Sequence, residues 1–237
     1  TAGAAATGAS VTGSIGATMT AAIGSTFTAT GTGTSLAVTS ITGYLSVGDV
    51  ISGTGVPAGT TIVAQVSGTT GSNGTYTTST ATTASSATVT SFGTVINVTA
   101  ITGYLSVGDT LSSGGVVTAQ LSGTAGGTGR YSFTPAATAY LASGTVTAYG
   151  TVLNVTAIGS GTLAIGDPVS GTGVPTNAVI SAFISGTYGG AGRYRLSVAA
   201  SAYAASTTVT ATAGVLTSFK AMSIAEVGEL VKISTRS

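Results

Sequence analysis

The feature that most constrains the fold is a heptapeptide, Gly-Tyr-Leu-Ser-Val-Gly-Asp, which occurs at 43–49 and again at 103–109. A relaxed copy, Gly-Thr-Leu-Ala-Ile-Gly-Asp, stands at 161–167, so the aspartates at 49, 109 and 167 lie 60 and 58 residues apart. Self-similarity at a nearly fixed period indicates a tandem array, in which fold and function are worked out one repeat at a time.

Each repeat has the pattern of a small β unit. Before each heptapeptide, a segment at 36–41, 96–101 or 153–158 alternates apolar with small polar residues, which is typical of a half-buried strand. A Gly-rich turn and a tyrosine follow further along. Five short strands with glycine turns between them predict an all-β fold, a row of about three five-stranded barrels or sandwiches. A β-solenoid is disfavoured because its coils usually repeat at about 20 to 30 residues.

The repeats divide the chain into five expected parts. Residues 1–34 form an N-terminal β segment, which is open to interpretation as a degenerate partial repeat. The three repeats, referred to below as repeats 1, 2 and 3, occupy 35–91, 92–149 and 150–213. Residues 214–237 carry the first two strands of a fourth copy without strands three to five.

The fourth copy is the expected attachment point. Unpaired strand edges favour pairing with another chain, and five of the 11 charged residues lie in the last 18 positions. We expect this segment to dock on a neighbouring subunit or on another protein of the same assembly. A terminal cap that covers repeat 3 is the alternative. The candidate docking residues are Phe219, Lys220, Glu226, Glu229, Val231, Lys232 and Ile233.

The Gly-Asp pairs are expected to form turns between the first two strands of each repeat. An Asp side chain bonds readily to nearby backbone N–H groups, and glycine adopts the backbone angles that turns need. A glycosidase-type mechanism needs two carboxylates, about 5 to 10 Å apart, whereas each repeat has a single Asp. The predicted turn residues are Gly48, Asp49, Gly108, Asp109, Gly166, Asp167, Gly228 and Glu229.

The composition argues against most catalytic and binding sites. The chain has no histidine and no cysteine, and 5% of its residues are charged against about 25% in ordinary domains. We therefore expect no catalytic residue, no metal site and no cofactor. A formal net charge of +1 gives no electrostatic footprint for nucleic acid. The longest apolar run, 139–142, is too short for a membrane-spanning helix.

The repeat pattern resembles one found in structural proteins of tailed bacteriophages. Leu-x-Val-Thr-x-Ile, then Val-Gly-Asp, Gly-Val-Pro and Gly-Thr-Tyr run through 36–76, and a close variant covers 153–194. The closing Val-Gly-Glu-Leu-Val-Lys-Ile-Ser is similar to the ends of such proteins. The resemblance implies a head decoration protein, a head fibre or a tail fibre component.

The expected function is therefore a non-enzymatic virion structural protein that stabilises or extends the particle through contacts between β modules. Its location would be the virion surface. Its partners would be further copies of itself, with a trimer as one arrangement, and a major capsid or tail protein. The alternative is a surface adhesin or receptor-binding stalk that recognises bacterial surface glycans. An enzyme such as a depolymerase is disfavoured by the absence of a carboxylate pair and of histidine.

Overall fold

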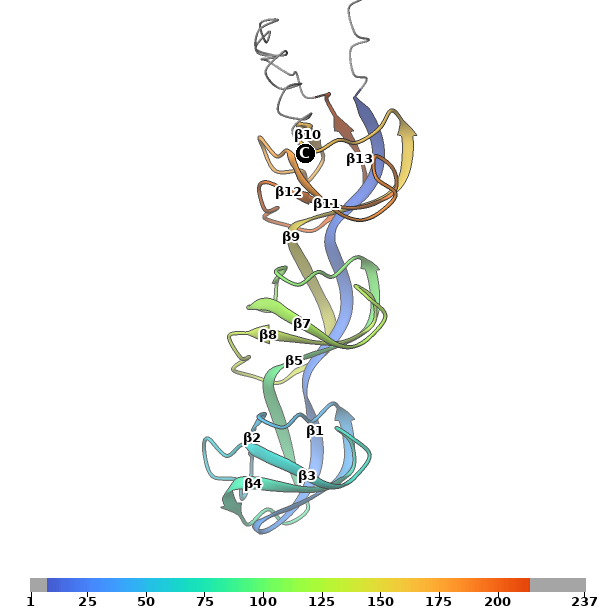
Figure 1. Ribbon diagram of the computed structural model, residues 1–237. Coiled ribbons are helices and arrows are strands. Elements are labelled where there is room, and N and C mark those ends of the chain that lie inside the picture. The colour runs from blue at the N-terminus through green and yellow to red at the C-terminus, as the bar shows by residue number, and fades with distance from the viewer. Residues whose placement is uncertain (1–7, 214–237) are drawn as a thin grey trace, which may run out of the picture.

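The computed structural model describes residues 8–213 as an elongated row of three parts (Figure 1). These residues form strands and no helix, so the predicted all-β class is confirmed. Their antiparallel pairs join into one 13-stranded sheet. The expected docking residues, Phe219 to Ile233, lie outside the described residues together with the turn pair Gly228 and Glu229.

The strands fall into two groups. Four line up along the spine of the row: β1 (Ala9–Gly43), β5 (Ala87–Gly103), β9 (Leu141–Ser160) and β13 (Ala204–Ala211). The others are shorter: β2 (Val50–Gly53), β3 (Ile62–Gly68), β4 (Gly74–Thr82), β6 (Thr110–Leu111), β7 (Val116–Gly123), β8 (Gly129–Thr134), β10 (Val169–Gly171), β11 (Ile180–Gly186) and β12 (Gly192–Leu196).

Strand β1 runs through all three parts of the row (Figure 1). Its residues 9–15 pair with β13 and β9 of repeat 3. Residues 17–23 pair with β9 and β5 of repeat 2. Residues 25–29 pair with β5 of repeat 1, and the end of β1 pairs with β4. The N-terminal segment therefore contributes to every repeat, in the reverse of chain order.

The sequence of β1 has an eight-residue period that matches this pairing. Residues 9–16, 17–24 and 25–32 read ASVTGSIG, ATMTAAIG and STFTATGT. The glycines that end the first two octads, Gly16 and Gly24, both have a φ of 76°. A Cβ there would lie 2.0 Å from the carbonyl oxygen of Ala148 or 1.9 Å from that of Ser91. Only glycine fits these bends, where the register shifts between repeats.

The repeats are joined without linkers. β5 begins as the last strand of repeat 1 and continues as the first strand of repeat 2, and β9 does the same for repeats 2 and 3. β1 likewise continues into the first strand of repeat 1. The divisions expected at residues 34, 91 and 149 therefore fall inside strands.

Each repeat surrounds its own hydrophobic core. One core contains Phe27, Leu36, Ile51, Tyr76 and Val89, another Met19, Ile23, Ile96, Tyr131 and Val146, and another Val11, Ile15, Leu153, Tyr194 and Val209. In all three, β1 supplies apolar side chains that the repeat itself lacks. Period-2 alternation turns these side chains inward along β1.

The strand pairs close into rings. In repeat 2 they run from β1 through β5, β8, β7, β6 and β9 back to β1. Repeat 3 closes in the same order, with the isolated bridge Pro168–Val179 between its second and third strands. In repeat 1 the bridge Val50–Thr61 takes the same place, and Tyr44 N–H donates to Gly24 O at 3.2 Å between two parts of β1. The predicted unit had five strands, whereas each ring also includes a length of β1, because five strands alone would leave two open edges.

Candidate functional site

The Gly-Asp pairs lie in tight turns at the same place in each repeat. Gly48, Gly108 and Gly166 have φ angles of 92°, 93° and 95°, which favour glycine. The side chain of the following Asp accepts a hydrogen bond from the backbone N–H three residues earlier, at 2.9 Å for Asp49 and 2.8 Å for Asp109 and Asp167. The backbone of the Asp also pairs with the third strand, as Ile62 N–H donates to Asp49 O at 2.9 Å.

All three aspartates are buried. Burial raises the pKa of Asp49 and of Asp109 to about 6, against an ordinary value of 3.8. Hydrogen bonds from the Ser46 or Ser106 N–H oppose part of that shift. Asp49 also accepts a bond from the Ser91 hydroxyl at 3.2 Å, and Ser91 bonds to Ser25 of β1 at 2.9 Å. The turn of repeat 1 is thus tied to β1.

The three aspartates do not come together. Each lies in a different repeat, and the described residues contain no group of three His, Cys, Asp or Glu side chains suited to a metal ion. Neither a carboxylate pair for acid–base chemistry nor a metal centre can be built from one Asp per repeat. Their contacts are those of turn residues.

The buried tyrosines hold loops. The hydroxyls of Tyr76, Tyr131 and Tyr194 donate to the carbonyl oxygens of Ser72, Gly127 and Gly190 at 2.6, 2.7 and 2.8 Å. Burial raises the pKa of Tyr76 and of Tyr131 to about 12, so their hydroxyls stay protonated at neutral pH. These side chains fill the core and close the turn between the third and fourth strands.

A second set of residues joins neighbouring repeats. The guanidinium of Arg130 in repeat 2 lies 4.2 Å from the centre of the Tyr44 ring in repeat 1. Arg193 in repeat 3 lies 4.4 Å from that of Tyr104 in repeat 2, and also donates to the Tyr104 hydroxyl. Such cation–π contacts contribute about 0.5 to 2 kcal/mol each. We call these two contacts the junction clasps.

The residue types at the clasp positions differ at the two ends of the row, where residues 8–213 contain no further repeat to contact. The position of Tyr44 and Tyr104 is Thr162 in repeat 3, and that of Arg130 and Arg193 is Thr75 in repeat 1. Glycine lies under each clasp tyrosine. A Cβ on Gly71 or Gly126 would lie 2.1 or 2.2 Å from the ring, whereas the nearest atom to one on Gly189 is at 3.5 Å. Sequence reasoning missed the clasp tyrosines, although these paired exchanges with threonine were visible in the sequence.

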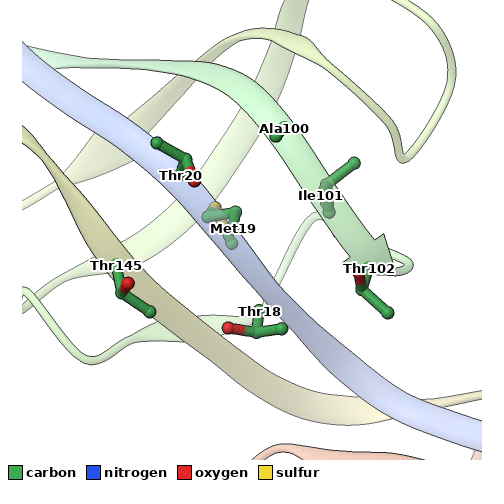
Figure 2. A pocket seen from close by; sticks show the side chains of 7 residues that line it. All are labelled: Thr18, Met19, Thr20, Ala100, Ile101, Thr102 and Thr145. Carbon is green, nitrogen blue, oxygen red and sulfur yellow. The ribbon is translucent and has the colours of Figure 1, made fainter.

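The described residues that line the hollow in Figure 2 are not ionisable. Thr18, Met19 and Thr20 reach it from β1, Ile101 and Thr102 from β5, and Thr145 from β9. Its volume is about 150 Å³, and its walls offer hydroxyl and apolar groups. A nucleophile would need an adjacent base, which this lining does not provide.

The described residues include no helix long and apolar enough to cross a membrane. Comparisons with protein-family models, with curated proteins and with solved structures found no match.

Proposed function

We propose that this protein is a non-enzymatic structural protein of a virus particle, a capsid decoration or fibre component that stabilises or extends the particle. The observation that carries the proposal is β1, a strand of 35 residues that pairs with all three repeats. A continuous hydrogen-bonded strand resists bending and stretching better than flexible linkers do. A chain without histidine or cysteine suits a spacer or covering.

Under this proposal, each repeat and its length of β1 form one small closed β-barrel module. Ring closure removes exposed sheet edges, which otherwise invite aggregation. The junction clasps and the long strands β5 and β9 then hold successive modules in fixed orientation. Attachment through residues 214–237 remains a prediction from the sequence.

The location can be tested on assembled particles. The protein would carry a small genetically encoded label, and images of labelled and unlabelled particles would be compared. Extra density on the capsid surface or along a fibre supports the proposal. Particles that assemble without the protein, together with the protein free in solution, would contradict it.

One described side chain favours the alternative of a glycan-binding stalk. Tyr188 is 62% exposed and meets Phe183 edge to face, with ring centres 5.5 Å apart. An exposed, fixed aromatic ring is a suitable surface for stacking on a sugar. Loss of host-cell adsorption in Tyr188→Ala particles of normal assembly would favour the stalk, whereas unchanged adsorption would remove this support.

A further inference from the structure

Two exposed apolar positions recur in every repeat. One lies two residues before the Asp and the other ten residues before the buried tyrosine. Exposed fractions at the first are 62%, 62% and 55% for Val47, Val107 and Ile165, and at the second 66%, 50% and 39% for Val66, Leu121 and Ile184. We call these six side chains the apolar row.

At both positions of the apolar row, the three repeats have apolar side chains that differ in size. Another exposed apolar residue, Val63, is Thr118 in repeat 2 and Ser181 in repeat 3. Single exposed apolar residues are ordinary, and substitution by hydroxyl residues at such places costs little. Three repeats that keep Val, Leu or Ile at two exposed positions therefore indicate a surface that is covered in use.

The apolar row follows the length of the molecule. Val47 and Leu121 line one groove at the junction of repeats 1 and 2, with a volume of about 260 Å³. Val107 and Ile184 line the matching groove between repeats 2 and 3, of about 240 Å³. Leu121 belongs to β7, which lies opposite β1 in the ring of strands. Leu121 thus lies on the side of repeat 2 that faces away from β1.

We propose that the apolar row is the surface on which a second copy of this chain packs side by side with the first. A partner must present apolar groups at the spacing of the repeats, and the chain itself has that spacing. The charged side chains that line the two grooves are Arg130, Arg193 and Arg195, and no acid is among them. Arg130 and Arg193 are held in the junction clasps. The six side chains of the apolar row are themselves uncharged, so the row brings no like charges together when two copies pack on it.

This inference goes beyond the proposed function, which names no surface between copies. The expectation of a homo-oligomer from the sequence likewise gave no residues. Because each repeat adds the same pair of contacts, the strength of association would rise with the number of repeats engaged. Weak contact at one repeat then becomes firm attachment along the whole length.

The test compares two lysine variants of the full chain by sedimentation equilibrium over a range of concentrations. Val107→Lys places a charge in the middle of the apolar row, and Thr145→Lys places one on β9 beside the hollow of Figure 2. We expect the wild type and Thr145→Lys to associate equally, and Val107→Lys to associate at least about 100-fold more weakly. A monomeric wild type, or equal association of all three, would overturn the proposal.

Folding and geometry are checked separately. Val107 is mostly exposed, so the lysine variant should keep the wild-type melting temperature, and Val47→Lys repeats the test in repeat 1. The chain has no cysteine, so Val107→Cys would link two copies under mild oxidation, and Thr145→Cys would not. Equal disulfide linking of the two cysteine variants would contradict the proposal that copies pack through the apolar row. These assays use the isolated protein. A negative result would therefore count against the apolar row alone, whereas absence of the protein from particles would count against the proposed function.

Discussion

Strand β1 and the hairpins of the repeats form two contrasting regions of the molecule. β1 pairs with strands of all three repeats, whereas each hairpin, such as β7–β8, lies within one repeat. The hairpin β7–β8 contacts the preceding repeat through a junction clasp, in which Arg130 of β8 lies over Tyr44. Backbone pairing along β1 therefore links the three repeats, whereas each hairpin affects only the orientation of its own repeat relative to a neighbour. Damage to β1 should therefore spread, and damage to a hairpin should stay confined.

The largest effect is expected from a substitution at a bend of β1. In Gly16→Ala the new Cβ would meet the Ala148 carbonyl oxygen at 2.0 Å and would strain a φ of 76°. We expect a loss of about 4 kcal/mol in the free energy of unfolding. Gly33→Ala is the matched control, with a φ of 61° and no atom within 4 Å, and should lose about 1 kcal/mol. Equal losses in urea titrations would contradict the close packing of β1 against β9 at Gly16.

The buried turn carboxyls should make the protein more stable in mild acid. Folding raises the pKa of Asp109 from 3.8 to about 6, so the folded state holds a proton that the unfolded state has released. The contribution of this carboxyl to the free energy of unfolding is therefore complete below pH ~4, decreases as the pH rises to ~6, and is lost above that pH. The shift is worth at most about 3 kcal/mol for each such carboxyl.

Unfolding titrations from pH 4 to pH 7 check this prediction. Asp109→Asn, which cannot ionise, should flatten the curve relative to the wild type while Asp49 continues to titrate. A wild type that is more stable at pH 7 than at pH 4 would show that these carboxyls are not the buried groups described.

A hairpin substitution should have a smaller and local effect. Gly126→Ala would displace the Tyr104 ring, which lies 2.2 Å from the new Cβ, and would strain a φ of 67°. We expect a loss of about 2 kcal/mol. Gly189→Ala has the same backbone strain, with a φ of 75°, and no clasp tyrosine, so about 1 kcal/mol is expected. Hydrogen exchange should change around the junction of repeats 2 and 3 in the first variant alone.

The smallest effect is expected at the clasp itself. Arg193→Ala should lower the free energy of unfolding by about 1 kcal/mol, because it removes the contact with Tyr104 and the bond to the Ser185 hydroxyl. Thr75→Ala, at the equivalent position of repeat 1, should change it by less than about 0.5 kcal/mol. A double-mutant cycle with Tyr104→Ala measures the coupling. A coupling energy near zero would show that the contact between Arg193 and Tyr104 does not stabilise the junction.

The local features of the fold were predictable from the sequence, because alternation and glycine turns act over a few residues. The place of β1 was not, since Ser10 pairs with Ser160, far along the chain. Its eight-residue period is the signal that sequence reasoning overlooked, hidden among small, simple residues. The junction clasps were missed for a related reason: Tyr104 and Arg193 belong to different repeats, and only their exchange for threonine elsewhere links them.

β1 joins the repeats into one continuous body, and hydrogen–deuterium exchange of the wild-type protein measures this continuity. If β1 is part of this body, amides of residues 9–29 that are paired in the sheet exchange as slowly as those of β5 and β9, in all three repeats. Rapid exchange throughout 9–29, beside slow exchange in the repeats, would show that the repeats fold without this strand and that β1 does not join them.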